Sequence, residues 1–75
     1  MMSKEYKEGT IFQLLLKGSE AAGVVEDWYY QNMKVDLRLR RAKTKGCCVI
    51  ETTDVLFASR ILLYHPSAKV NIKEP

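Results

Sequence analysis

The stretch that decides the fold is residues 35–42, VDLRLRRA, in which apolar and charged side chains alternate. Val35, Leu37 and Leu39 share one side of an extended chain, and the charged side chains share the other. Such a strand covers a core with one face and meets water or a polar partner with the other. Apolar segments precede and follow it, so we expect it to be the central strand of a small sheet.

Three other segments are expected to be strands. Residues 10–17, TIFQLLLK, predict the first strand, because apolar side chains recur at every second position. Residues 47–57 are rich in Val, Ile, Thr and Cys and predict a long strand after a basic hairpin turn at residues 43–46. Residues 61–64, ILLY, predict a short last strand, since a proline follows closely and removes a donor.

Residues 19–32, SEAAGVVEDWYYQN, allow two interpretations. The opening Ser-Glu-Ala-Ala is typical of a helix start. The interior Gly23, followed by β-branched and aromatic residues, favours a bent strand. We predict a bent strand over residues 20–28 and keep the helix as the alternative. Residues 29–34, YYQNMK, would then be a loop.

The length of 75 residues indicates one domain. We divide it into an N-terminal helix or tail (residues 1–9), a barrel (residues 10–65) and a polar C-terminal tail (residues 66–75). Five short, bent strands cannot cover a core as an open flat sheet. The expected fold is therefore mostly β, a short N-terminal helix followed by a strongly bent five-stranded antiparallel barrel. Chains this short often gain stability by oligomerising.

The formal net charge of +3 favours anionic partners. Cys47 and Cys48 are adjacent and would point to opposite faces of a strand, so we expect no disulfide between them. With one histidine at no metal spacing, we also expect no metal site. No paired carboxylates or glycine-rich phosphate loop occur, so we expect no catalytic residue and no cofactor. Free thiols, no secretion signal and no apolar run of the roughly 20 residues that cross a bilayer predict a cytoplasmic protein without membrane contact.

The order of these features resembles the Sm-like family, the LSm and Hfq ring proteins. The family's first signature is matched by an apolar strand ending near Gly18, a second glycine at Gly23, the aromatic Trp28 and the strand of residues 35–39. Asp36 stands where the family usually has asparagine.

The family's second signature is an apolar pair, a short polar break and a closing apolar strand. Residues 56–64 match it, although Ala58 and Ser59 replace the usual Arg-Gly or Lys-His pair and a basic residue comes only at Arg60. The resemblance implies the barrel and a homo-oligomeric ring of about five to seven subunits, in which the last strand of one subunit pairs with the fourth strand of the next. The expected interface residues are Val55, Phe57, Ile61, Leu62, Leu63 and Tyr64.

The resemblance also implies non-enzymatic binding of single-stranded RNA on the loops that face the pore of the ring. Aromatic stacking and amide hydrogen bonds suit unpaired bases. The implied RNA-binding residues are Tyr29, Tyr30, Asn32, Asp36, Ser59 and Arg60. The expected phosphate contacts are Lys34, Arg38, Arg40, Arg41 and Lys43. Asp36 could instead have a structural role, as an acceptor for backbone amides of a loop. The basic residues after it could instead form a face that only contacts solvent.

Two other functions stay open from the sequence. An Sm-like ring that has lost RNA binding would be a scaffold, as the departures at Asp36 and Ser59 suggest. If residues 19–32 form a helix, the chain would instead be a small α/β protein that regulates another protein.

Overall fold

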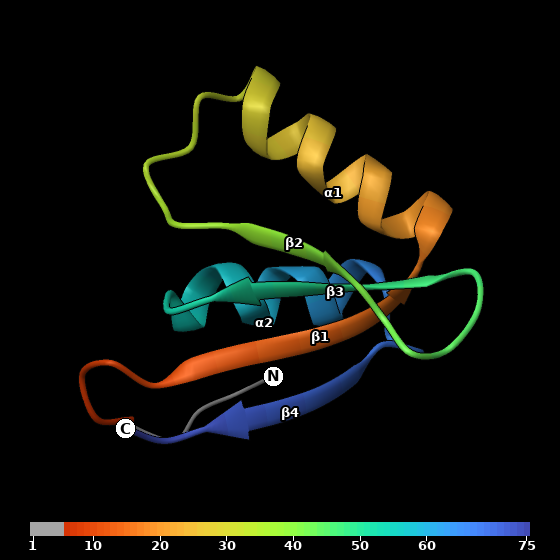
Figure 1. Ribbon diagram of the computed structural model, residues 1–75. Helices are drawn as coiled ribbons and strands as arrows, with labels where there is room; N and C mark the ends of the chain where they lie inside the picture. The colour runs from red at the N-terminus through yellow and green to blue at the C-terminus, as the bar shows by residue number, and fades with distance from the viewer. Residues whose placement is uncertain (1–5) are drawn as a thin grey trace.

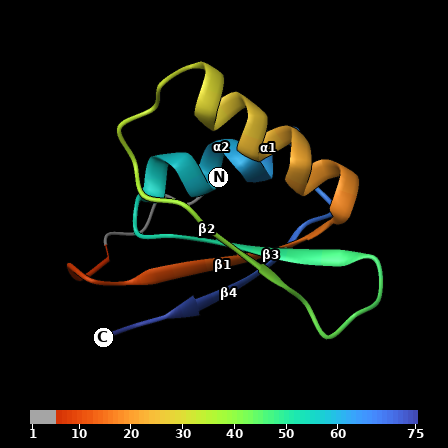
Figure 2. The ribbon, with the colours of Figure 1, turned by 45° about the horizontal axis from the view of Figure 1, so that its top comes forward.

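The computed structural model describes residues 6–75, which form an open four-stranded antiparallel sheet with two helices on one face (Figures 1 and 2). The elements are, in order, β1 (Ile11–Lys17), α1 (Gly18–Tyr30), β2 (Arg38–Arg41), β3 (Cys47–Thr52), α2 (Val55–Tyr64) and β4 (Lys69–Lys73). The strands lie in the order β2-β3-β1-β4. Each β-α-β half therefore has a strand of the other half between its own two strands, which is the split, ferredoxin-like arrangement.

The expected five-stranded barrel is wrong. Residues 20–28 and 61–64, expected to be strands, lie in α1 and α2. The helix kept as the alternative for residues 19–32 is confirmed. Residues 66–75, expected to be a polar tail, contain β4. The expected N-terminal helix falls partly on residues 1–5, outside the described residues, and the described residues before β1 form a turn and not a helix.

Helix α1 forms because its apolar residues bury one helical side. Ala21, Val24 and Trp28 are three and four residues apart, and all three pack into the core. At the helix start, the Glu20 carboxylate accepts a hydrogen bond from the backbone N–H of Lys17 at 3.3 Å. Tertiary burial and this cap together outweigh the strand preference of the β-branched and aromatic residues.

Helix α2 begins at a side-chain cap. The Asp54 carboxylate accepts a hydrogen bond from the backbone N–H of Phe57 at 2.8 Å, which satisfies a free donor of the first turn. Phe57, Ala58 and Ile61 then face the sheet. The ILLY segment is the last turn of this helix, because its Ile61 continues the buried side that Phe57 starts.

Strand β1 occupies the middle of the sheet, where it pairs antiparallel with β3 and β4 (Figure 1). The strand expected over residues 10–17 is thereby confirmed, as is the hairpin at residues 43–46, which joins β2 to β3. The strand expected over residues 47–57 stops at Thr52, because α2 begins shortly after it. Residues 35–42 supply an edge strand, β2, rather than the central one.

The core lies between the sheet and the helices. Its fully buried hydrophobic residues are Phe12, Leu14, Leu16, Ala21, Val24, Ile50, Phe57, Ala58 and Ile61. Val35 and Leu37 pack against this core from the segment before β2, as their alternation predicts. Leu39 faces the same side, opposite Ile50, but it is 50% exposed because β2 is an edge strand. No described element covers the opposite side of the sheet (Figure 2). One broad surface of the sheet is therefore accessible to a partner.

Candidate nucleic-acid interface

The uncovered side of the sheet, here called the open face, carries the side chains that alternate with the buried ones. Strand register places on it Ile11, Gln13, Leu15 and Lys17 of β1, Arg38 and Arg40 of β2, Cys47, Val49 and Glu51 of β3, and Lys69, Asn71 and Lys73 of β4. Five of these residues are cationic and one is acidic. The prediction that Arg38 and Arg40 point away from the core is confirmed, because their neighbours in β3 are Glu51 and Val49.

A row of polar side chains crosses all four strands of the open face. Asn71 Nδ2 donates a hydrogen bond to Gln13 Oε1 at 2.7 Å, and Gln13 Nε2 donates to a carboxylate oxygen of Glu51. Arg40 Nε lies 3.5 Å from the same Glu51 oxygen. Because each member contacts its neighbour, the row holds both amides in defined positions on the face.

Glu51 is the one carboxylate of the open face. The hydrogen bond from Gln13 is the main cause that holds the pKa of Glu51 below its usual value. Partial burial acts in the opposite direction, and the positive charges of Arg40 and Lys73 lower the pKa further. Glu51 is therefore ionised at neutral pH and cancels part of the charge of Arg40, while the remaining cations set the sign of the face.

A depression of about 370 Å³ lies on the open face. Leu15 and Val49, which are register partners, supply apolar surface to it. Its polar lining consists of Gln13, Asn71 and Thr44, and its cations are Arg40, Lys43 and Lys69. The volume falls in the lower part of the range of about 300–1,000 Å³ that small-molecule sites occupy. The depression therefore combines apolar surface, hydrogen-bonding groups and positive charge.

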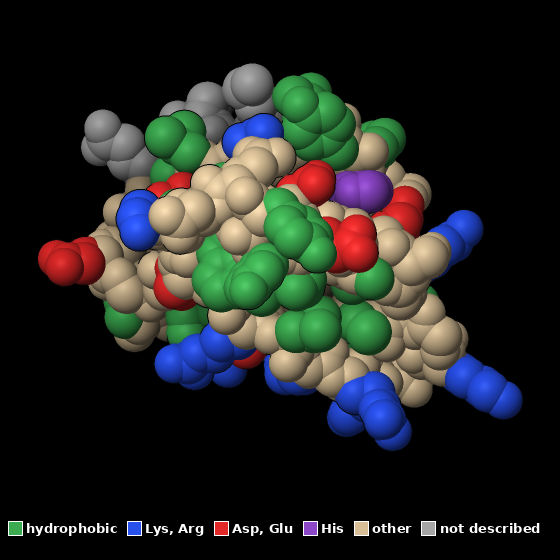
Figure 3. Space-filling model, turned by 90° about the horizontal axis from the view of Figure 1, so that it is seen from above, with side chains coloured by type: hydrophobic (Ala, Val, Ile, Leu, Met, Phe, Trp, Pro, Cys, Tyr) green, Lys and Arg blue, Asp and Glu red, His purple; other side chains and the backbone are tan. Residues whose placement is uncertain are grey.

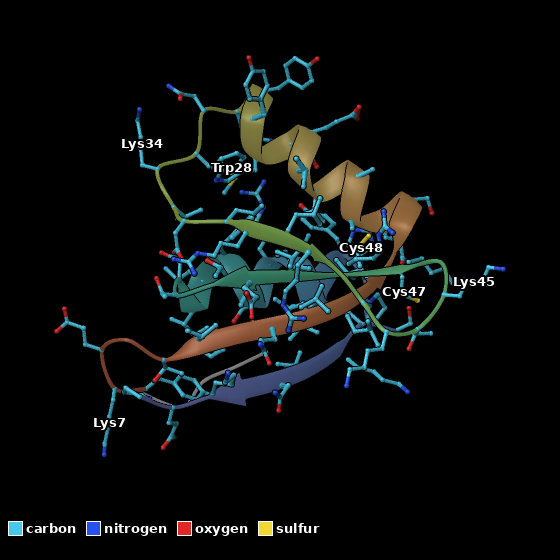
Figure 4. All side chains as sticks on the ribbon, viewed as in Figure 1. Lys7, Trp28, Lys34, Lys45, Cys47 and Cys48 are labelled. Atoms are coloured by element: carbon cyan, nitrogen blue, oxygen red, sulfur yellow. The ribbon has the colours of Figure 1, made fainter. Side chains whose placement is uncertain are left out.

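The structure divides the expected phosphate contacts between two places. Arg38 and Arg40 lie on the open face, and Lys43 lines the depression. Arg41 pairs with Cys48, which packs against the core, so Arg41 points to the other side of the sheet. Lys34 precedes β2 and lies at the opposite end of that strand from the hairpin, as Figure 4 shows by its separation from Lys45.

The expected aromatic loop is the end of helix α1. Tyr29 and Tyr30 are exposed, and their rings meet edge to face with centroids 5.4 Å apart. Asn32 follows with a φ of 50°, the left-handed conformation in which asparagine commonly ends a helix. These three residues belong to the helix side of the molecule and do not meet the open face.

Asp36 has the geometry of the structural alternative. Its carboxylate accepts hydrogen bonds from the Thr53 backbone N–H at 3.0 and 3.1 Å, from the Thr53 hydroxyl at 2.7 Å and from the Thr52 hydroxyl at 3.3 Å. Partial burial alone would raise the pKa of Asp36, but the bonds from Thr53 and Thr52 outweigh it and lower the pKa. Asp36 thus ties the segment before β2 to the turn before α2.

Ser59 and Arg60 lie on α2 rather than on a loop. Ser59 is buried and its hydroxyl oxygen has no hydrogen-bond partner among the described residues. Arg60 is exposed, with its guanidinium carbon 6.0 Å from the centre of the Tyr64 ring. A groove of about 300 Å³ runs between α1 and α2, and Arg60 is one of the residues that line it.

The expected ring interface has no strand to form it. Phe57 and Ile61 are buried in the core, and Val55 and Leu62 are partly buried against it. Leu63 and Tyr64 are exposed, but on a helix that has no free backbone edge. Pairing of a fourth with a fifth strand between subunits is therefore ruled out for this fold.

Sequence reasoning missed Gln13, Glu51, Lys69 and Asn71 as site residues. Gln13 and Asn71 are separated by 58 positions in the chain, so their contact is invisible before the strands are paired. The alternation in KVNIK is the local signal for β4, and it is weak because the segment is short and mostly polar.

Cys47 and Cys48 are both free and lie side by side at the hairpin end of β3, labelled in Figure 4. Cys48 packs against the core while Cys47 belongs to the open face, which confirms that the pair points to opposite sides. Within residues 6–75, no three His, Cys, Asp or Glu side chains are grouped so that they could hold a metal ion. In the same residues, neither helix is long and apolar enough to cross a membrane.

Comparisons with known proteins give no relative. Neither protein-family models, nor curated proteins, nor solved structures include a match to this chain.

Proposed function

We propose that this protein binds single-stranded RNA on the open face of its sheet and acts as a binding protein rather than an enzyme. The observation that carries the proposal is the depression on that face. An unpaired base needs apolar surface for its ring and hydrogen-bonding groups for its edge, and its phosphate needs a cation. Leu15 and Val49, the amides of Gln13 and Asn71, and the surrounding cations meet these three needs in one place.

Negative charge is concentrated on helix α1 and positive charge on the open face, which supports the open face as the RNA-binding surface. Helix α1 carries Glu20, Glu26 and Asp27 and no lysine or arginine. The open face has the opposite balance, and Figure 3 shows Lys and Arg side chains gathered along the lower edge of the view, beneath the helix layer. A polyanion is therefore attracted to the sheet side and repelled from α1.

The shape of the open face favours a single strand over a duplex. Recognition in a duplex groove uses a projecting helix or β-ribbon, whereas the twelve residues of the open face lie on the surface of the sheet itself. Three inter-strand gaps separate β2 from β4, so the cations at its two edges lie roughly 14 Å apart. A flexible strand can cross that width and place one base in the depression. The two amides also offer hydrogen bonds to a ribose 2′-hydroxyl, which favours RNA over DNA.

The open face carries no aromatic side chain among its twelve residues, so stacking has to use Leu15 and Val49. We therefore expect phosphate contacts to supply most of the affinity and binding to weaken steeply with salt. A cytoplasmic location belongs to the same proposal, because the free thiols of Cys47 and Cys48 suit a reducing compartment.

The test is fluorescence anisotropy with short labelled RNA oligonucleotides over a series of salt concentrations. The variants are Arg40→Ala and Lys69→Ala, whose side chains line the depression from opposite edges of the sheet. Lys34→Ala is the matched control, since it removes the same charge at a site away from the open face. Each depression variant is expected to weaken binding and to reduce the slope of log K against log salt by about 0.7 per lost phosphate contact.

Two results would contradict the proposal. One is equal binding by the wild type, Arg40→Ala and Lys69→Ala. The other is a larger loss in Lys34→Ala than in either of them. The same assay is repeated with a DNA oligonucleotide of the same sequence, and we expect the protein to bind it more weakly than the RNA.

A further inference from the structure

Helix α2 is apolar on the side that faces away from the sheet. Its sequence, VLFASRILLY, has one charged residue, Arg60. Leu56, Leu63 and Tyr64 are 78%, 65% and 67% exposed. The outer side of a surface helix is normally polar, and a helix that is apolar all round is normally buried. The outer side of α2 is therefore the surface that a partner is expected to cover.

The exposed residues of α2 form one continuous ridge, here called the outer ridge. Leu56, Arg60 and Leu63 are spaced at i, i+4 and i+7 and so lie above one another on the helix. Tyr64 adjoins them, since its ring lies 6.0 Å from the guanidinium carbon of Arg60. The outer ridge is thus large and apolar with a single positive charge in the middle.

The outer side of α1 has the complementary character. Ala21 and Val24 are buried against the sheet, so Ala22 and Glu26 face outward and are exposed. Gly23 has nothing within 4 Å of the place where a side chain would start. Around Ala22 and Gly23 this side is therefore small in volume, and Glu26 makes it negatively charged just before the exposed Tyr29 and Tyr30 at the helix end.

The two helices are antiparallel neighbours in one layer. His65, which follows α2, lies 3.3 Å from Glu20, in the first turn of α1. The groove between the helices is lined by Asp27 of α1, by Gln31 just after it and by Arg60 of α2. A two-fold axis that runs along this groove would place α1 of a second copy over α2 of the first copy, and α2 of the second copy over α1 of the first. Each apolar, cationic α2 would then pack on an acidic α1.

We propose that a second copy of this chain covers the helix layer, with the outer ridge of each α2 packed on α1 of the other copy. The Arg60 side chain of each copy then meets Glu26 of its partner, and the contact occurs twice, as an isologous dimer requires. The molecule measures 31 × 28 × 19 Å along its principal axes, so a broad face offers roughly 700–900 Å², close to the ~800 Å² per partner of a stable interface. Figure 3 shows hydrophobic side chains across the middle and upper part of this face. The inference does not depend on RNA binding, since both open faces stay uncovered.

The first test is the mass of the full-length protein by native mass spectrometry and by light scattering over a range of concentrations. We expect a dimer for the wild type and a monomer for Leu63→Glu. The matched control is Ile11→Glu, because Ile11 is partly exposed but lies on the open face, on the other side of the sheet from the helix layer, and its variant should remain dimeric.

The second test is charge reversal, with far-ultraviolet circular dichroism to confirm that each variant is folded. Arg60→Glu and Glu26→Arg are each expected to give a monomer, and the double variant is expected to recover the dimer. A folding defect would not be repaired in this way. A wild type that stays monomeric at all concentrations overturns the proposal and leaves another protein as the occupant of the ridge. A dimer that none of these substitutions affects overturns it too, because the interface then lies elsewhere.

Discussion

Replacing Asp36 by alanine distinguishes a structural role, in which its carboxylate accepts hydrogen bonds from Thr52 and Thr53, from a role in RNA binding. The carboxylate accepts three kinds of hydrogen bond, from the backbone N–H and hydroxyl of Thr53 and from the hydroxyl of Thr52. All of them hold the segment before β2 against the turn that starts α2. If this is the role of Asp36, the variant loses stability while the folded protein binds RNA as before.

The size of the loss can be worked from these contacts. A hydrogen bond to a charged group contributes about 1.5–3 kcal/mol, and a group that remains in contact with water falls at or below the lower end. Asp36 is exposed, so we take about 2 kcal/mol for the whole set. For a domain of this length, that lowers the melting temperature by roughly 10 °C.

The assay is urea denaturation followed by far-ultraviolet circular dichroism, which reports both helices. Glu74→Ala is the control, since it removes a carboxylate at an exposed position near the chain end. Because the pKa of Asp36 is lowered in the folded state, its contribution is fully present above the unfolded pKa and is lost as the pH falls through the folded value. The wild type and Asp36→Ala should therefore differ at neutral pH and converge as the pH falls through the lowered pKa of the folded state.

A loss no larger than that of Glu74→Ala would refute the structural role. A fall in RNA affinity without any change in stability would instead indicate that Asp36 contacts the RNA.

Three further outcomes are expected. Leu14→Ala, which empties a fully buried position of β1, should cost about 2–5 kcal/mol in the free energy of unfolding, measured by urea denaturation. Glu51→Gln should bind RNA more tightly than the wild type in the anisotropy assay, because it removes the one negative charge of the open face and frees Arg40; weaker binding would show that the carboxylate is needed to position its neighbours. The wild type should lose more stability than Glu51→Gln when the pH falls below about 4.5, since the lowered pKa of Glu51 adds stability that is present above its unfolded pKa and lost as the pH falls through its folded pKa.

Local physical chemistry accounts for the elements that could be predicted from the sequence. The alternation in residues 10–17 and in residues 35–42 sets which side chains face the core, because a strand turns its side chains to opposite faces whatever lies around it. The hairpin at residues 43–46 is equally local, since Gly46 has a φ of 80° that other residues rarely adopt. The outward direction of Arg38 and Arg40 follows from the same alternation.

Contacts between distant segments decided the rest. Residues 19–32 carry both a helix start and strand-forming side chains, and the helix prevails because Ala21, Val24 and Trp28 can cover β1 and β3 only at helical spacing. The same holds for ILLY. Its four residues by themselves favour a strand, but they continue a helix that the Asp54 carboxylate caps at its start.

The open face divides in the same way. The sequence predicts only part of its charge, because Arg38 and Arg40 alternate with apolar residues in one segment. Lys17, Lys69 and Lys73 join them on the same face only when β1 pairs with β3 and β4. The depression on the open face could not be predicted from the sequence. Leu15 and Val49 meet across β1 and β3, and Gln13 meets Asn71 across β1 and β4, only when the sheet orders its strands β2-β3-β1-β4. The sequence by itself determined which side chains share a face of each strand. Only the tertiary structure decided which strands lie side by side, because pairing joins residues that are tens of positions apart and share no local signal.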